Sequence, residues 1–285
     1  MLLIATVILS LGTGEMALSF PRVQLSSQTI CQGELAVITL ELKEGATPLV
    51  RWLDREVYLV PDAPGKIWHG FLAADLKARP GRYPLLIKVL PGPWEKTLEV
   101  TVDRKDRGVR RLKLPKKMVD LDAATLERVK KEAALMEEVF NEPPAAPLWR
   151  GRFLSPVDGE VVGPFGQASV INDSPRAPHS GVDLRADRGT PVLAMNRGKV
   201  VLVADQFFTG LSVVIDHGGA VQSMYFHLDR VLVSQNDQVQ RGRVIGLVGS
   251  TGRASGPHLH LGVRVNSARV DPLQLTLVSA TMEQP

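Results

Sequence analysis

The sequence has very little cysteine. Cys31 is the single cysteine among 285 residues, so the chain cannot form an internal disulfide. No C-x-x-C pair is present either, which excludes a thiolate zinc site of the usual spacing. Any metal ion must therefore be held by histidine, aspartate or glutamate side chains.

Long apolar runs are also lacking. The N-terminal segment Met1–Leu11 is too short for a bilayer span of about 20 residues, but it has the length of a signal-peptide core. Small residues precede a cleavage position after Ser19, so we predict a signal peptide over residues 1–19 and export of the chain. The usual basic start is absent, since no Lys or Arg occurs before Arg22, and a buried first strand is the alternative. Export argues against nucleic acid as a partner, and no later segment has the pattern of a stable membrane span.

The excess of positive charge is small. A net charge of +4 suits nucleic acid, an anionic membrane or an anionic wall polymer, and it discriminates weakly among them. Hydrophobic residues make up 44% of the chain and charged residues 22%, which excludes a wholly disordered protein. The 25 glycines and 20 prolines favour short strands and turns over long helices, and the length suffices for about two domains.

Residues 20–103 have the pattern of a small β-sandwich. Glu34–Leu42, Tyr83–Leu90 and Thr97–Val102 are rich in strand-forming residues, and clusters of proline and glycine separate them. Short strands at this spacing are typical of an immunoglobulin-like sandwich. The lone His69 is predicted to be structural.

Residues 104–148 are expected to join two β domains. The basic run Arg104–Lys117 could bind an anionic polymer, but a solvated connector is the preferred interpretation. In Ala123–Phe140, apolar residues recur at steps of three and four, which predicts one amphipathic linking helix, docked on a flanking domain and capped by Asp122. The apolar stripe consists of Leu126, Val129, Ala133, Met136 and Phe140. A proline-rich linker follows.

Residues 149–285 show no helical period and are predicted to form an all-β domain. His179 and Asp183 form an H-x-x-x-D segment that is extended or looped, which could bring an imidazole and a carboxylate to one ion. In the sequence P-H-L-H-L, alternation along a strand places His258 and His260 on one face and the leucines toward the core. The alternative for the H-x-x-x-D segment is a surface histidine near a turn aspartate. The alternative for H-L-H is a polar outer face that happens to hold two histidines.

Two further histidines lie in the same region. Alternation along Y-F-H-L predicts that Tyr225 and His227 share a face. His217 lies in a D-H-G-G turn and is interpreted as a turn residue rather than a ligand.

Together, these residue types suggest a catalytic zinc site. Two histidines and one aspartate supply three ligands and leave the fourth tetrahedral position for water. Bound zinc can lower the pKa of that water to about 7. The sequence has no H-E-x-x-H motif, so a histidine must replace the usual glutamate base.

The order H-x-x-x-D, Y-x-H-L and H-L-H, within glycine-rich β sequence, resembles the lysostaphin/LytM-type zinc metallo-endopeptidases, metallopeptidase family twenty-three. The resemblance covers residues 153–272 and implies a small, twisted antiparallel β metallopeptidase domain. It implies one Zn²⁺ per chain, with His179, Asp183 and His260 as the ligands.

The same resemblance implies His227 and His258 as the catalytic histidines. His258 is the better candidate for the general base, and the sequence leaves the division of roles open. Two places depart from the family pattern: Asn236-Asp237 stands where Gly-Asp is usual, and residues 172–178 vary. For this reason no oxyanion tyrosine or substrate-pocket residue is assigned.

The function implied is that of an exported zinc metallo-endopeptidase of the periplasm or cell envelope, or a secreted one. It would hydrolyse peptide crosslinks of bacterial peptidoglycan by attack of zinc-bound water. The alternatives are a latent or non-catalytic cell-wall-binding regulator of other wall hydrolases, and a structural wall-binding protein. The sequence does not specify the bond cleaved, whether the crosslink is direct or bridged, or the oligomeric state.

Overall fold

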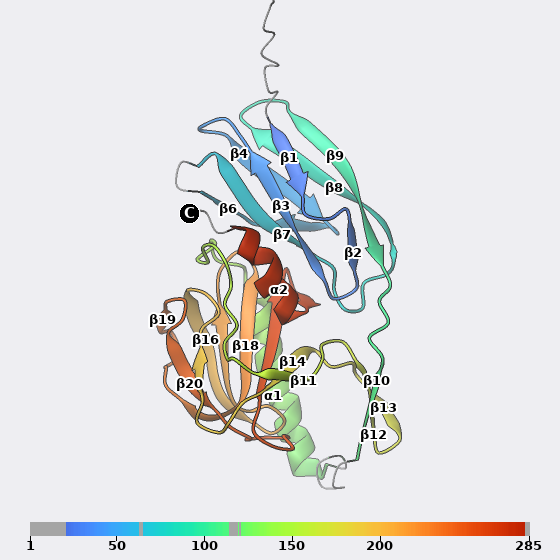
Figure 1. Cartoon of the computed structure of the whole chain (residues 1–285), viewed down its shortest axis with the longest axis vertical. Coiled ribbons are helices and arrows are strands. Elements are labelled where there is room, and N and C mark those ends of the chain that lie inside the picture. Colours follow the sequence, from blue (N-terminus) through green and yellow to red (C-terminus); the bar gives the residue numbers. More distant parts are fainter. Residues whose placement is uncertain (1–20, 63–64, 114–118, 120, 283–285) are drawn as a thin grey trace, which may run out of the picture.

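The computed structural model describes residues 21–62, 65–113, 119 and 121–282. The signal peptide predicted over residues 1–19 lies outside the described residues. Figure 1 shows one group of strands stacked above another, with the short helix α2 between them. The mainly β fold class is confirmed.

The N-terminal part is a sandwich of two sheets. The first has the order β1–β3–β7–β6, made of β1 (Arg22–Leu25), β3 (Leu35–Glu41), β7 (Ile67–Ala73) and β6 (Leu59–Pro61). The second has the order β2–β9–β8–β4–β5, made of β2 (Thr29–Cys31), β9 (Glu95–Asp103), β8 (Gly81–Leu90), β4 (Thr47–Trp52) and β5 (Arg55–Val57). Buried and exposed residues alternate along β4 and β8, and the buried ones fill the space between the sheets.

The basic connector is more ordered than the sequence suggested. Part of it forms β10 (Val109–Leu112), which pairs in parallel with β12 (Ala168–Ile171), and β12 pairs with β13 (Ser174–Arg176). Three of the four β10 residues are exposed, which agrees with a solvated connector, but the strand pairing was not expected: the backbone hydrogen-bonding groups of β10 are taken up by a strand far along the chain. Figure 1 shows this small sheet beside the C-terminal strands.

Helix α1 (Ala123–Asn141) confirms the predicted linking helix. The Asp122 side chain accepts a hydrogen bond from the Thr125 amide, so the predicted N-cap is also confirmed. Val139 is buried against the C-terminal sheet with Met136 and Phe140 beside it, while Leu126 at the other end is exposed. Of the predicted stripe, Met136 and Phe140 pack in this apolar cluster, and nearer the start of the helix Glu132 accepts a hydrogen bond from the Phe207 amide at 2.9 Å.

The C-terminal part is built on one large sheet with the order β11–β14–β21–β18–β17–β16–β19. Its strands are β11 (Glu160–Gly163), β14 (Gly181–Arg185), β21 (Leu259–Val265), β18 (Val221–Val231), β17 (Gly210–Asp216), β16 (Gly198–Gln206) and β19 (Gln238–Val239). Off this path, β20 (Val244–Val248) pairs with β15 (Pro191–Leu193) and with β18, and β22 (Ala268–Val270) pairs with β21.

The all-β prediction missed the C-terminal end of the chain. Helix α2 (Pro272–Ser279) is capped by Asp271 and is followed by a 3₁₀ turn, η2 (Ala280–Met282). The Asp271 carboxylate accepts from the Leu273 amide, and Pro272 is in the first turn, where its missing N–H costs nothing. No helix in the described part of the chain combines the length and apolarity that a membrane span requires.

The sandwich and the C-terminal sheet share one apolar core. Phe71 of β7 packs against Trp149, with ring centroids 5.1 Å apart, and against Phe153 at 6.1 Å. A half-buried ion pair between Asp75 and Arg269, at 2.6 Å, adds a polar contact at this boundary. The sandwich is therefore held firmly against the C-terminal part.

Candidate active site

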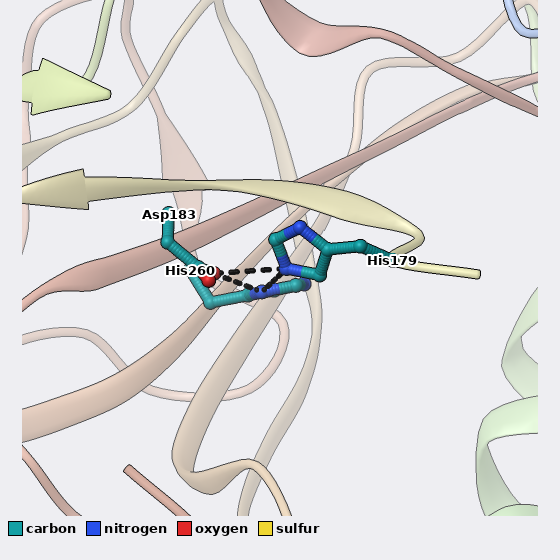
Figure 2. Close-up of side chains that lie close together, drawn as sticks. All are labelled: His179, Asp183 and His260. Carbon is teal, nitrogen blue, oxygen red and sulfur yellow. Dashed lines mark hydrogen bonds and ion pairs between the residues drawn. The ribbon is translucent and has the colours of Figure 1, made fainter. Parts of the chain in front are cut away.

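Two adjacent strands bring the predicted ligand residues together. Strands β14 and β21 are antiparallel, and their register places Asp183 directly opposite His260. His179 lies two residues before β14, and its side chain turns back toward the same point. Figure 2 shows the three side chains pointing toward one another.

The three candidate ligand atoms form a compact triangle. Asp183 Oδ1 is 2.7 Å from His260 Nδ1 and 3.0 Å from His179 Nε2, and the two nitrogens are 3.1 Å apart. Zinc bonds of about 2.0–2.1 Å in a tetrahedron place ligand atoms about 3.3–3.4 Å apart. The side chains need to separate by less than about 1 Å to admit such an ion. Two imidazoles and one carboxylate are also a donor set that zinc commonly takes, so the residues fit the metal.

Hydrogen bonding prepares His179 to act as a ligand. Its Nδ1–H donates to the Pro164 carbonyl at 3.0 Å, so the neutral ring carries on Nε2 the lone pair that faces the triangle, and only the charged ring donates from Nε2 to Asp183. Burial lowers the pKa of His260, although the neighbouring Asp183 opposes this change. A lowered pKa favours the neutral imidazole that can bind a metal.

The close packing around these side chains requires glycine at two positions. A Cβ at Gly181 would lie 2.5 Å from His260 Nε2, and a Cβ at Gly163 would collide with the Asp183 carboxylate. Both glycines lie on strands that flank the triangle, in β14 and β11. A side chain at either place would displace a candidate ligand.

Asp183 divides its two oxygens between different partners. Oδ1 faces the two histidines, and Oδ2 lies 3.4 Å from Arg110 Nη1 on β10. Burial alone would raise the pKa of Asp183, but hydrogen bonds from His179 and His260 outweigh it and hold the pKa well below the usual range. The carboxylate is therefore ionised.

The other two predicted histidines lie beside the triangle. The ring centroids of His227 and His258 are 4.8 Å apart, and those of His227 and His260 are 6.0 Å apart. His258 Nε2 is 3.9 Å from Asp183 Oδ1. The three predicted ligands and the two predicted catalytic histidines are thus gathered in one place.

A backbone irregularity, rather than simple alternation, brings His227 there. Its φ of 63° is unusual for a non-glycine residue, and the pairing of β18 with β17 shifts register in this stretch. The prediction that Tyr225 and His227 share a face is wrong, because this bulge turns His227 to the site while Tyr225 stays in the core. The Tyr225 hydroxyl accepts from the Met195 amide at 2.9 Å.

Backbone carbonyls also fix the tautomers of the two histidines. His227 Nδ1–H donates to the Thr251 carbonyl and His258 Nδ1–H to the Gly256 carbonyl, both at 2.8 Å. In the neutral form each ring therefore keeps Nε2 free to accept a proton. Burial lowers the pKa of His227 to about 4, so this ring is neutral near pH 7.

Two residues of the site were not singled out from the sequence. The Phe226 ring stacks on His260, with centroids 5.5 Å apart and planes 7° apart, and so fixes that ring. Arg110 comes from a strand 73 positions before Asp183. Nothing local in the sequence indicates either contact, although Phe226 lies in the Y-F-H-L segment and Arg110 in the basic run of the connector.

His217 is buried in the core, away from the triangle. Its Nδ1–H donates to the Arg197 carbonyl at 2.9 Å, and its Nε2 is 2.8 Å from the Ser223 hydroxyl. It does not join the ligand group among the described residues. Its role is to connect the D-H-G-G turn to two neighbouring segments.

The buried state of His217 predicts a loss of stability in acid. Burial lowers its pKa to about 4 from about 6.5, so below pH 6.5 the unfolded chain binds a proton that the folded chain does not. The free energy of unfolding should fall by about 3 kcal/mol between pH 6.5 and pH 4 from this residue. Denaturant unfolding of wild type and His217→Gln at several pH values measures the difference in slope. Equal slopes in the two proteins would contradict the prediction.

Comparisons with known proteins agree with this geometry. Residues 177–272, which contain all five residues, match the model of peptidase family M23. The chain is 40% identical over 100 residues to the peptidoglycan DD-endopeptidase ShyB of Vibrio cholerae; the match covers 35% of this chain and 24% of ShyB. It is 39% identical over 106 residues to the DD-carboxypeptidase/endopeptidase Mpg of Neisseria meningitidis, covering 37% of this chain and 24% of Mpg. The match thus spans about a quarter of each curated relative.

A solved structure matches almost the whole chain. A crystal structure from Pseudomonas aeruginosa, assigned to peptidase M23, is 32% identical and superposes with a TM-score of 0.67. The match covers 88% of this chain and 95% of that one, so it includes the N-terminal sandwich as well as the site. The chain therefore belongs to peptidase family M23.

Proposed function

We propose that the protein is an exported zinc metallo-endopeptidase that hydrolyses peptide crosslinks of bacterial peptidoglycan. The observation that carries the proposal is the triangle of His179 Nε2, Asp183 Oδ1 and His260 Nδ1, with two more histidines beside it. The substrate is proposed from the relatives, whose names describe peptidoglycan endopeptidases. Export is proposed from the apolar segment Met1–Leu11.

His179, Asp183 and His260 would hold the zinc ion. When bound, zinc polarises the scissile carbonyl and makes water a nucleophile near neutral pH. The ionised Asp183 supplies one negative charge to the site, and the two imidazoles bind as neutral ligands. Phe226, stacked on His260, keeps that ring in place.

We assign the general base to His258. Its Nδ1–H is fixed on the Gly256 carbonyl, so its Nε2 is free to take a proton from the attacking water and pass it to the leaving amine. His227, with its pKa lowered to about 4, would hold such a proton poorly. We assign His227 to hydrogen bonding with the scissile carbonyl oxygen. Negative charge that develops on this oxygen raises the pKa of a nearby histidine and favours its charged, donating form.

The test is digestion of purified peptidoglycan by the zinc-loaded full chain. We expect crosslinked muropeptides to be converted to monomers with one new free amine for each bond cut, read by mass spectrometry. A chelator should stop the reaction, and added zinc should restore it. Failure of a protein with one zinc per chain to release any amine would contradict the proposal.

The position of β10 raises the alternative of a latent enzyme or a regulator. Arg110 contacts Asp183 from the connector, so the N-terminal part reaches the site directly. However, Arg110 engages Oδ2, whereas the ligand triangle uses Oδ1, so this contact leaves the ligand atom available. A zinc-loaded protein that binds peptidoglycan in sedimentation assays without cutting it would favour the alternative. The intact chain should be used, because removal of the sandwich would expose Trp149 and Phe153.

A further inference from the structure

The small sheet beside the site carries a row of polar side chains that the mechanism above does not use. Arg110 of β10 is paired with Ser169 of β12, and Ser169 is paired in turn with Arg176 of β13. Residues directly opposite each other in neighbouring strands project from the same face of a sheet. The two arginine backbones are therefore about 10 Å apart, with Ser169 between them.

The contacts of Arg110 show which way this face points. Its Nε–H donates to the buried Ser169 hydroxyl at 2.9 Å, and its Nη1 lies 3.4 Å from Asp183 Oδ2. The row therefore faces the ligand triangle. Arg176 is exposed and lies three residues before His179, and its guanidinium makes no hydrogen bond or ion pair with another described residue.

A third arginine approaches from another loop. Arg253 follows Thr251, whose carbonyl accepts from His227, and its guanidinium lies over the Phe208 ring, 4.1 Å from the centroid. The Arg253 amide also donates to the Phe208 carbonyl at 2.9 Å, so backbone contacts hold this loop beside His227 and bring a third guanidinium to the site. Burial lowers the pKa of Arg253, and the positive charges of Arg176 and Arg110 lower it further. A bound anion would be attracted by all three positive charges.

We propose that Arg110, Arg176 and Arg253 form a subsite for a free carboxylate of the substrate peptide. The inference rests on the proposed function. Guanidinium groups bind carboxylates with paired, charge-assisted hydrogen bonds, and Arg176 has its donors available. Asp183, which pairs with Arg110, is itself a candidate metal ligand.

Peptide chemistry limits where that carboxylate can be. An acyl-side residue with a single carboxyl group uses it in the scissile bond, so an adjacent free α-carboxylate then belongs to the residue whose amine is released. Such a residue is either a chain end or a diamino acid joined through its side-chain amine. In a bridge of several glycines, the residue after an internal bond has its carboxyl group in the next amide. The subsite therefore selects direct crosslinks over glycine bridges.

The experiment uses two crosslinked peptides that differ only in the amine-side residue, which carries either a free α-carboxylate or a carboxamide. The zinc-loaded full chain should cleave the carboxylate peptide with a kcat/KM about 10- to 100-fold higher. Arg176→Gln should reduce this preference to less than about 3-fold, mainly through kcat/KM for the carboxylate peptide. Arg82→Gln, an exposed arginine of the N-terminal sandwich, makes the same charge change and should keep the full preference.

A binding measurement separates this inference from the proposed function. Calorimetric titration with the amine-side product, as carboxylate and as carboxamide, needs no hydrolysis. Tighter binding of the carboxylate, lost in Arg176→Gln, would support the subsite even if neither peptide were cleaved. Equal cleavage of the two peptides with equal binding of the two products would overturn the subsite while leaving the hydrolase intact.

Discussion

Replacing His260 by alanine is expected to abolish zinc retention and to reduce peptidoglycan hydrolysis by at least about 10³-fold. His260 Nδ1 is the ligand atom nearest to Asp183 Oδ1, at 2.7 Å, and its ring is fixed by Phe226 and by the space that Gly181 leaves. Without it, two protein ligands remain, which is fewer than the three that catalytic zinc sites use.

Zinc content by atomic absorption and amine release from peptidoglycan measure the two effects together. The matched control is His69→Ala, which removes a histidine of the N-terminal sandwich whose Nδ1 contacts the Thr39 hydroxyl. This variant should keep one zinc per chain and nearly full activity. A His260→Ala protein that retained both zinc and hydrolysis would rule out the proposed ligand set.

The second large effect is expected at His258. His258→Ala should lower kcat by about 10²–10⁴-fold, the usual contribution of a general acid–base, while zinc stays at one per chain. The reason is that His258 Nε2 lies 3.9 Å from Asp183 Oδ1, close to the triangle but outside it, with Nδ1 fixed on Gly256. Loss of zinc together with loss of activity would instead identify His258 as a ligand.

His227→Ala provides the comparison within the site. If His227 acts on the carbonyl oxygen, its loss should also lower kcat with zinc retained, but the pH dependence should differ from that of His258→Ala. The basic group seen in the pH profile of kcat should survive in His227→Ala and disappear in His258→Ala. The opposite pattern would exchange the two roles.

Local patterns were sufficient for several elements of the fold. The three- and four-residue apolar steps and Asp122 predicted helix α1 and its cap, because both signals act within a few residues. Alternation in H-L-H correctly placed Leu259 and Leu261 in the core, since β21 is regular there. The gathering of the five site residues was implied by the resemblance of the whole motif set, not by any one spacing.

Other features depended on residues far apart in the sequence. The orientation of His227 followed from a bulge in β18 that arises only when this strand pairs with its neighbours. The order in β10 followed from pairing with β12, 59 positions away at Arg110 and Ser169. The sequences of β18 and β10 do not by themselves show which strands they pair with.

By itself, then, the sequence determined the mainly β class, the linking helix and the residue types available to a metal, because these follow from composition and short-range periodicity. Only the tertiary structure decided that His179, Asp183 and His260 present their ligand atoms within one triangle, that His227 turns toward it, and that Arg110 reaches Asp183. The physical reason is register: a strand's partner and alignment decide which side chains meet, and pairing energies are summed over the whole sheet rather than within one segment.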